Sequence, residues 1–410
     1  METQRIRRRN FYREIKSFWP DLYGEEYALY DIAPITQEEA EEIRVCTHRI
    51  GNIFFKICDL LRNVESNTLL ELGFPNETLD FLRMKTLNHG SVIARLDLIK
   101  TEATYKCIEM NADTPTFIKE LFLVNGLVAK DFGYRNPNES TEKQLAKAVR
   151  NAIGSSAKWL SEVEPYIVFT AHEENIEDKN TVLYLQELYG LPSRFISLDK
   201  LTIQRGEGLF DEDGRKIDIL YRQTYPIESM ILDKDDSDNP IGLWLIELIE
   251  TKKLAVVNPP SAFLLQNKAI QAVIWGMHEN KHPFFSKEEH QWIEQYFLPT
   301  YLEADHFHET KTPYVKKPIF GREGDTVQIF NSNGKLILEE QQKSYDHLPS
   351  IFQQYIELPS ANYATESGIK CGHILIGSFL VSGEPSAFGY RVGGKITNNL
   401  SCFLPAGIKK

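Results

Sequence analysis

Two short polar segments of the sequence could together bind a metal ion and a phosphoryl group. The first contains Arg95 and Asp97, and the second contains Glu109 and Asn111. Residues two apart on a β-strand share a face, so the two members of each pair are expected to point in the same direction. Their apolar neighbours are expected on the opposite face: Leu96, Leu98, Ile108 and Met110.

The turn between the two segments predicts how their side chains meet. If the turn is centred on Ala103, Asp97 faces Glu109 and Arg95 faces Asn111 across a β-hairpin. This cluster of oxygen ligands suits Mg²⁺, which would also relieve the repulsion between the two carboxylates. The alternative is a solvated hairpin face with an exposed ion pair, which is a common surface feature.

Two lysines further along the chain could bind phosphate. Lys268 stands near the start of a helix expected over about 267–278, and Lys317 precedes a glycine-containing loop that begins Gly321-Arg322. Glycines permit the tight turns with which a backbone can surround phosphate. Each feature is weak alone, because a lone lysine is usually solvated and a Gly-x-x-Gly segment is usually a simple turn.

Hydrophobic periodicity predicts the elements that must position these residues. The segment that opens at Thr36 has the form of a capping box and continues as an amphipathic helix to about residue 61. Strands are expected over 92–98 and 104–111. Alternating strand and helix patterns over 165–257 indicate an inserted α/β domain.

Composition and charge limit the class of protein. The 410 residues are 42% apolar and carry a formal net charge of −12, which predicts a globular chain of two or three domains without general affinity for nucleic acid or anionic membranes. No run of about 18 apolar residues indicates a membrane span. The five cysteines lie far apart and are odd in number, which favours reduced thiols and a cytoplasmic location.

The order of these motifs resembles that of a known family. The motifs are Arg95-Leu96-Asp97, Glu109-Met110-Asn111-Ala112-Asp113-Thr114, Asn267-Lys268-Ala269-Ile270 and Lys317-Pro318-Ile319-Phe320-Gly321-Arg322. Together they resemble the synthetase domain of the glutathionylspermidine synthase family over about residues 90–391. The resemblance implies an α+β protein with a circularly permuted ATP-grasp fold, in which the metal ligands precede the nucleotide-binding lysines, and with an inserted α/β (pre-ATP-grasp) domain.

The resemblance also implies a division of the chain into three parts. Residues 1–160 would contain an N-terminal helical segment and the metal-binding hairpin, and residues 161–257 would form the inserted domain. Residues 258–410 would form the ATP-binding lobes. The amidase domain that bifunctional members of the family carry is not expected, and the oligomeric state is left open.

The same resemblance implies roles for individual residues. It implies three magnesium ligands, Asp97, Glu109 and Asn111, and two arginines beside the transferred phosphoryl group, Arg95 and Arg391. ATP would be bound by Lys268, Lys317, Gly321, Arg322 and the hinge residues Gln354, Tyr355 and Ile356. The substrate pocket would contain Thr114, Thr116, Glu177, Asp178, Glu228 and Ser229. Taken alone, Glu177 and Asp178 would instead be an exposed acidic turn.

The implied activity is that of an ATP-dependent carboxylate–amine ligase. Such an enzyme, with ATP and Mg²⁺ as cofactors, would join a peptide carboxylate to a polyamine through an acyl phosphate. Thr114 and Thr116 stand where the family usually has serines, and Glu228-Ser229 replaces a Glu-Thr pair, so a ligase for another acid or amine is an alternative. A nucleotide-binding homologue that has lost catalysis is a second alternative.

Overall fold

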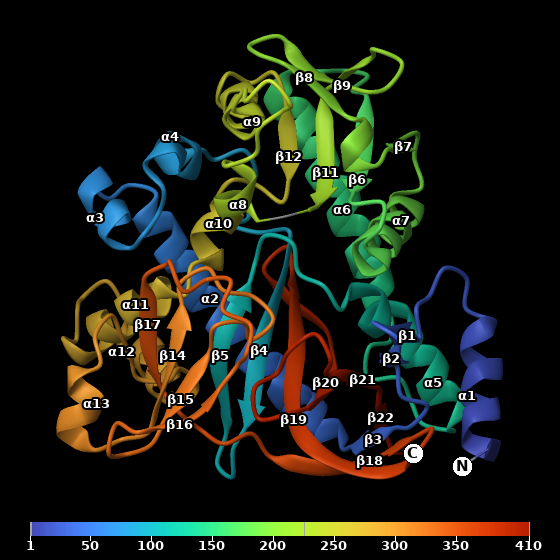
Figure 1. The fold of residues 1–410 in the computed structure, drawn as a ribbon, viewed down its shortest axis with the longest axis vertical. Helices are drawn as coiled ribbons and strands as arrows, with labels where there is room; N and C mark the ends of the chain where they lie inside the picture. The colour runs from blue at the N-terminus through green and yellow to red at the C-terminus, as the bar shows by residue number, and fades with distance from the viewer. Residues whose placement is uncertain (1, 225, 410) are drawn as a thin grey trace.

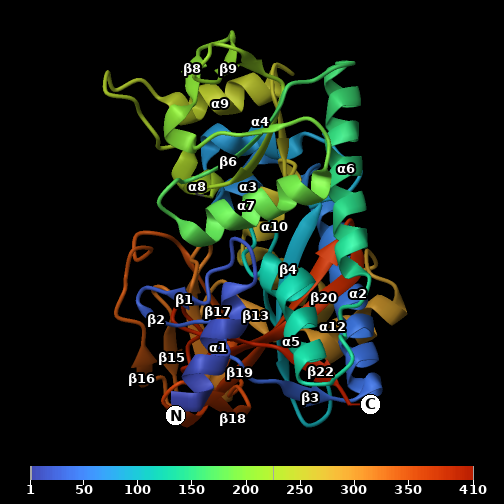
Figure 2. The ribbon, with the colours of Figure 1, turned by 90° about the vertical axis from the view of Figure 1, so that its right-hand side faces the viewer.

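The predicted hairpin lies in an antiparallel sheet at the centre of the molecule. The computed structural model describes residues 2–224 and 226–409 (Figures 1 and 2). The strands run in the order β21-β20-β19-β4-β5, and β18 pairs with part of β19. Their bounds are β4 (Ile93–Lys100), β5 (Tyr105–Asn111), β18 (Ser360–Thr365), β19 (Gly368–Val381), β20 (Glu384–Gly393) and β21 (Cys402–Leu404). The hairpin is therefore completed into a sheet by the C-terminal part of the chain.

A long helix covers one face of this central sheet. Helix α2 (Gln37–Leu61) has the predicted capping box, in which the Thr36 hydroxyl accepts from the Glu39 amide and the Glu39 carboxylate accepts from the Thr36 amide. The apolar side of α2 is buried in one cluster with Leu96 and Leu98 of the sheet. Burial of each such side chain contributes about 1.5–3 kcal/mol. The polar residues of the hairpin are thereby directed to the opposite face.

A second antiparallel sheet lies beside β4 and β5 (Figure 1). Its strands, in the order β13-β17-β14-β15-β16, are β13 (Thr300–Tyr301), β17 (Ser350–Gln354), β14 (Tyr314–Pro318), β15 (Gln328–Phe330) and β16 (Leu336–Glu339). The helices in this part are α10 (Ser261–Gln266), α11 (Ala269–Glu279), α12 (Lys287–Tyr296) and α13 (Asp305–Thr310). The helix predicted over 267–278 is α11, which places Lys268 directly before its first residue.

The segment predicted as an inserted α/β domain contains a parallel sheet, at the top of Figure 1. Its strands, in the order β12-β11-β6-β7, are β12 (Ala255–Val257), β11 (Ile219–Gln223), β6 (Ile167–Ala171) and β7 (Arg194–Phe195). Next to it are η3 (Leu198–Lys200), β8 (Thr202–Gln204), β9 (Gly208–Phe210), β10 (Lys216–Ile217), α7 (Ile176–Tyr189), α8 (Ile227–Met230) and α9 (Ile241–Glu250). Helix α6 (Thr141–Leu160) packs against α7 and also reaches β19 and β20 (Figure 2).

The remaining elements connect these parts. They are α1 (Glu2–Arg13), β1 (Asp21–Leu22), β2 (Glu25–Glu26), β3 (Ala33–Ile35), α3 (Ser66–Glu71), η1 (Asn76–Thr78), α4 (Leu79–Arg83), the π-helical turn η2 (Glu120–Val124), α5 (Asn125–Asp131) and β22 (Ala406–Ile408). The parallel pairing of β3 with β22 brings the N-terminal and C-terminal segments together.

The register of the hairpin is the predicted one at its functional end. Arg95 pairs with Asn111, and Asp97 pairs with Glu109. Between Asp97 and Leu98 the register shifts by one residue, so that Ile108 forms a β-bulge. The bulge makes one prediction wrong: Ile108 does not share the face of Leu96 but lines the site cavity. It also leaves the Ile108 carbonyl available to Gln271 Nε2, which donates to it at 3.0 Å.

The buried side chain of Asn258 connects the start of β4 to the end of β5. Its Oδ1 accepts from the backbone amides of Val92 and Ile93 at 2.9 and 3.2 Å. Its Nδ2 donates to the carbonyls of Ala112 and Asp113 at 3.1 and 2.6 Å. These bonds satisfy backbone groups that have no access to water, and they hold the two strands in the register that the site requires.

Substitution of Asn258 by alanine is expected to destabilise the protein by about 3 kcal/mol or more. Several buried amides and carbonyls would lose their partners, and each unsatisfied group costs about 1–3 kcal/mol. Denaturant unfolding followed by circular dichroism measures the change. Asn280→Ala is the matched control, because this exposed asparagine donates to the Gly276 carbonyl in its own helix turn and should change stability by less than about 0.5 kcal/mol. Equal effects of the two substitutions would contradict the role given to Asn258.

Candidate active site

One cavity gathers most of the predicted site residues. It lies between the polar face of β4 and β5 and the second antiparallel sheet, and its open volume is about 1410 Å³, including solvent at its mouth. Predicted residues that line it are Arg95, Asp97, Glu109, Asn111, Thr114, Thr116, Glu177, Lys268, Lys317, Gly321, Arg322, Gln354, Tyr355, Ile356 and Arg391.

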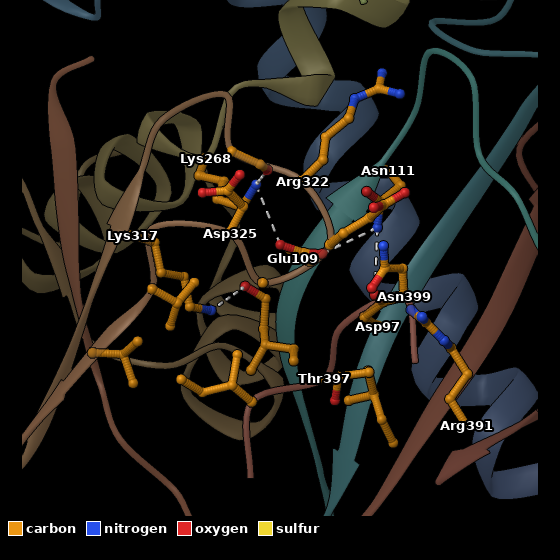
Figure 3. Close-up of a pocket in the computed structure, with 18 of the residues that line it drawn as sticks. Asp97, Glu109, Asn111, Lys268, Lys317, Arg322, Asp325, Arg391, Thr397 and Asn399 are labelled. Atoms are coloured by element: carbon orange, nitrogen blue, oxygen red, sulfur yellow. Dashed lines mark hydrogen bonds and ion pairs between the residues drawn. The ribbon is translucent and has the colours of Figure 1, made fainter. Parts of the chain in front are cut away.

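Two carboxylates and an amide converge at the functional end of the hairpin. Asn111 Nδ2 lies 3.4 Å from Asp97 Oδ2 and 3.3 Å from Glu109 Oε1 (Figure 3). Rotation of the Asn111 amide by half a turn would present its oxygen to the same point, giving the set of oxygen donors that Mg²⁺ prefers. The candidate metal site is this set of two carboxylates and one amide. Within residues 2–224 and 226–409 no cluster of three or more His, Cys, Asp and Glu side chains has metal-binding geometry.

Lys268, directly before α11, and Lys317, on β14 of the second sheet, balance the negative charge of this set. Lys268 Nζ lies 3.3 Å from Glu109 Oε2 and also donates to the Gly321 carbonyl. Burial alone would raise the pKa of Glu109, but Lys268, Lys317 and Arg95 outweigh it and lower this pKa to about 2. Glu109 is therefore ionised at neutral pH and able to act as a metal ligand.

Lys317 is buried and held by neutral groups. It donates to Gln353 Oε1 at 2.9 Å, and Gln353 Nε2 donates in turn to Gln271 Oε1 and Thr300 Oγ1, both at 3.2 Å. Burial lowers the pKa of Lys317 to about 8, although Glu109 acts in the opposite direction. Such a lysine carries a charge that is poorly compensated, and an anionic ligand would stabilise it.

Two arginines flank the carboxylates on the side away from Lys317. Arg95 donates to Asp97 Oδ1 at 2.7 Å and to the Thr116 carbonyl at 2.9 Å, which fixes its guanidinium beside the predicted metal ligands. Arg391 projects from β20 and donates to the Asn398 carbonyl at 2.8 Å. Figure 3 shows Arg391 beyond Asp97, so cations lie on both sides of the carboxylates.

Two loops meet over the mouth of the cavity. Gly321 has no room for a side chain, because an added Cβ would lie 2.3 Å from Pro318. Gly324 has a φ of +72°, and an added Cβ would lie 2.7 Å from the Thr397 carbonyl oxygen. The loop around Gly321 therefore closes against a second loop, from which Lys395, Thr397 and Asn399 also line the cavity.

The end of the cavity next to the hinge residues is apolar. Ile99, Ile108, Leu358 and Leu375 form one wall with Ile356, and Val315, Val327 and Ile329 contribute from the second sheet. Gln354 and Tyr355 continue the rim at this end. A flat aromatic base fits such a slot, since its faces would be removed from water while its edges meet the chain.

The predicted substrate residues divide into two groups. Thr114, Thr116 and Glu177 line the cavity, whereas Asp178, Glu228 and Ser229 lie outside its lining. Both carboxylate oxygens of Glu228 are buried without a hydrogen-bond partner in the described part of the chain. Burial raises the pKa of Glu228 to about 7, with Arg322 acting against it, so Glu228 lies close enough to the cavity to sense its charges.

Glu177 and Asp178 lie in the first turn of a helix rather than in the exposed acidic turn of the alternative reading. Helix α7 begins at Ile176, because the Asn175 side chain caps it by accepting from the Asp178 amide at 3.0 Å. Burial raises the pKa of Asp178 to about 6, and burial together with the nearby Glu120 raises the pKa of Glu177 well above its ordinary value. Both acids are half-buried, although a pair of acids on a helix usually faces water.

Several residues of the site region were not predicted from the sequence. Gln266 accepts from the amides of Ala112 and Asp113, and Gln353 holds Lys317. Glu120 is fully buried, with one oxygen bonded to the Tyr27 hydroxyl at 2.6 Å and the other without a partner among the described residues. Short motifs such as Glu-Met-Asn and Lys-Pro can be recognised in the sequence. A single Gln or Glu outside a motif can be assigned to the site only when the residues around it in the structure are known.

Three comparisons relate the chain to known proteins. The model of a family described as "Glutathionylspermidine synthase preATP-grasp" matches residues 6–409. A protein of Haemophilus influenzae named "Putative acid--amine ligase" is 28% identical over an alignment of 317 residues that covers 73% of this chain and 70% of that protein. The structure of a glutathione synthetase-like effector from Globodera pallida, in its apo form, superposes with a TM-score of 0.58 at 12% identity, covering 99% of this chain and 96% of that one.

The fold and the comparisons define an α+β protein with the circularly permuted ATP-grasp fold and an inserted α/β domain, and they indicate an acid–amine ligase. The chain belongs to the glutathionylspermidine synthase family. None of the helices in the described ranges is long and apolar enough to cross a membrane.

Proposed function

We propose that the protein is an ATP-dependent ligase that joins the carboxylate of a peptide-like acid to a cationic amine through an acyl phosphate. The observation that carries the proposal is the convergence of Asp97, Glu109 and Asn111 on one point, with lysines on one side and arginines on the other. Phosphoryl transfer requires little covalent chemistry from a protein, and depends on positioning and on the compensation of charge.

The two ends of the cavity suggest how ATP is oriented. We place adenine in the apolar slot beside Gln354, Tyr355 and Ile356, and the phosphates between Lys317 and Lys268. The closed loop at Gly321 would exclude water from the transferred group. When bound by Asp97, Glu109 and Asn111, Mg²⁺ would offset the charge of the phosphate oxygens.

The acid substrate is placed on the other side of the carboxylate cluster. Arg95 and Arg391 would hold its carboxylate in line with the terminal phosphate and compensate the charge of the acyl phosphate that forms. Arg322 donates to Thr114 Oγ1 at 3.1 Å, and its Nε is buried without a partner in the described ranges. We infer that Arg322, Thr114 and Glu228 recognise the charged groups of an amino-acid or peptide acid.

The amine is expected to be a cation. Glu177 lines the cavity, and Glu120, Asp178 and Glu323 are the charges that most disfavour its ionisation. An ammonium group placed among these carboxylates would relieve their repulsion and be held next to Arg391, where the acyl phosphate forms. The amine would lose a proton, attack the acyl carbon and release inorganic phosphate.

Mass spectrometry of reaction mixtures tests the proposed function. The protein would be incubated with ATP, Mg²⁺, a panel of peptides that includes glutathione, and a panel of amines that includes spermidine, putrescine and 1,3-diaminopropane. An amide product formed together with ADP is expected for at least one pair. A ligase for another acid is the second candidate, favoured by Thr114 and Thr116 in place of serines. ATP consumption without any amide product across the panel would count against the proposal.

ATP affinity is expected to fall as the pH rises through about 8. Lys317 has its pKa lowered to about 8 by burial, so it is charged below this pH and neutral above it. Phosphate stabilises the charged form of Lys317, so ATP should bind tightly at pH 7 and more weakly at pH 9. Near pH 8, binding of ATP should be accompanied by uptake of a proton by Lys317. Isothermal titration calorimetry in buffers of different ionisation enthalpy measures both effects. Adenosine, which lacks phosphate, is the control, and a pH-independent ATP affinity would contradict the role of Lys317.

We also propose the division into residues 1–160, 161–257 and 258–410, with a cytoplasmic location. The parallel sheet and its neighbours fall within the second part. Helix α6 ends the first part but packs against α7 of the second, so a truncation at residue 160 would expose apolar surface on both sides. Cys46, Cys58 and Cys107 are buried free thiols, which supports a reducing environment.

A further inference from the structure

A short N-terminal hairpin lies at the amine end of the cavity. It consists of β1 and β2, and Asp21 pairs with Glu26 across it. Leu22 and Tyr27 line the cavity together with Glu177. Figures 1 and 2 both place β1 and β2 directly below α7, the helix that carries Glu177 in its first turn. The hairpin thus forms a wall of the site, and its residues are distant in sequence from every motif of the family resemblance.

The tip of this hairpin has a strained backbone. Tyr23 has a φ of +53° and Gly24 a φ of +80°, the left-handed combination of a tight two-residue turn. Such turns favour Asn, Asp or Gly at the first position, and a bulky residue there is an outlier. Strained residues of this kind persist mainly at ligand clamps and switch regions, so the side chain of Tyr23 is expected to have a function.

The surroundings of Tyr23 indicate that function. Tyr23 is 66% exposed, and Leu22, the residue before it, lines the cavity. Burial and the negative charges of Glu323, Glu177 and Asp178 raise the pKa of the Tyr23 hydroxyl, and Glu323, Glu177 and Asn399 line the cavity. The aromatic ring therefore lies at the acidic end of the cavity. A cation that enters there would meet carboxylates and also the face of the ring.

The base of the hairpin is held by a buried arginine. Arg8, which is 2% exposed, donates through its guanidinium to Asp21 at 2.7 Å and to Glu366 at 3.0 Å, and lies 3.4 Å from Glu26. It also donates to the Ala28 carbonyl at 2.8 Å. Both ends of the hairpin are thereby fixed to the turn between β18 and β19, so movement is confined to the tip at Tyr23 and Gly24.

We propose that the N-terminal hairpin is a gate over the amine entrance, and that Tyr23 determines which amine is accepted by closing its ring over the bound cation. The inference rests on the proposed ligase function. The gate is assigned to the second substrate because Leu22 and Tyr27 line the cavity together with Glu177 and are not part of the apolar cluster of Ile99, Leu358 and Leu375, where adenine is placed.

Kinetics of substituted proteins test the gate. Tyr23→Ala is expected to raise the KM for the amine about tenfold, since it removes the cation–π contact, while the KM values for ATP and the acid stay unchanged. Tyr23→Phe keeps the ring and should restore most of the affinity. Ile6→Ala, at an exposed position of α1 on the same N-terminal arm, is the matched control. An amine KM of Tyr23→Ala equal to that of the unaltered protein would overturn the proposal.

Hydrogen exchange of the unaltered protein gives a second readout that does not depend on turnover. Amides of residues 22–26 are expected to exchange more slowly when spermidine is added in the presence of ATP and Mg²⁺, and to be unaffected by ATP and Mg²⁺ alone. Unchanged exchange with spermidine would also overturn the gate. Failure of the ligase function itself would appear differently, as an absence of amide product from the unaltered protein with every amine of the panel.

Discussion

Replacement of Asp97 by asparagine is expected to lower the rate of ADP formation by about 10²–10³-fold while the protein stays folded. The substitution keeps the shape of the side chain and an oxygen that can accept from Arg95, which lies 2.7 Å from Asp97. It removes one of two anionic ligands from the proposed metal site. The loss of a single group that stabilises charge in a transition state typically costs this much in rate.

The control for Asp97→Asn lies on the same hairpin. Glu102 is an exposed acid in the turn between β4 and β5, away from the cavity lining. Glu102→Gln removes the same charge from the molecule, and its rate of ADP formation should equal that of the unaltered protein. Circular dichroism and thermal unfolding would show that Asp97→Asn is folded. Full activity of Asp97→Asn would eliminate the proposed metal site.

Replacement of Lys317 by methionine is expected to lower kcat/KM for ATP about 10²-fold. Methionine has a similar length and apolar character, so it can fill the same buried space without the ammonium group. The ammonium lies among Glu109, Gln353 and the proposed phosphate position. Its loss removes a charge that compensates the phosphoryl oxygens.

The adjacent lysine supplies the comparison. Lys316 precedes Lys317 on β14, and successive side chains of a strand point to opposite faces, so Lys316 does not line the cavity. Lys316→Met should retain the ATP kinetics of the unaltered protein. Equal losses from the two substitutions would show that overall charge, rather than the position of Lys317, controls ATP use.

The functional end of the hairpin could be predicted because its information is local. The two-residue spacing of Arg95 and Asp97, and of Glu109 and Asn111, fixes which side chains share a face, and the short turn fixes which residues are opposite. The observed pairs are the predicted ones. The fold class was implied by the resemblance of these motifs to the glutathionylspermidine synthase family, and the family match over residues 6–409 confirms that resemblance.

The bulge at Ile108 could not be predicted because it depends on the second sheet. One extra residue in β5 lets the Ile108 carbonyl reach Gln271 and approach Lys317. Nothing in the apolar character of Ile108 distinguishes it from Met110, which stays in the core. The start of α7 at Ile176 depends on the cap by the Asn175 side chain, which hydrophobic periodicity does not reveal.

The other features that the sequence did not predict depend on contacts between segments distant in the sequence. Glu228 and Glu120 are surrounded by segments distant in sequence, so their burial and raised pKa values follow only from the tertiary structure. The N-terminal hairpin is too short and too polar to be recognised as a strand pair by periodicity. Its position at the cavity depends on residues distant in sequence, among them Arg8, which bonds to both Asp21 and Glu366.

The fate of one oxygen atom tests the central claim most directly. An acid substrate that supports turnover would be labelled with ¹⁸O in its carboxylate and supplied with ATP, Mg²⁺ and the amine, and the products would be analysed by mass spectrometry. Attack of the carboxylate on the terminal phosphorus predicts one ¹⁸O in inorganic phosphate for each amide formed, with unlabelled ADP. Label in AMP, or unlabelled phosphate beside the amide product, would contradict an acyl phosphate intermediate at the site of Asp97, Glu109 and Lys317.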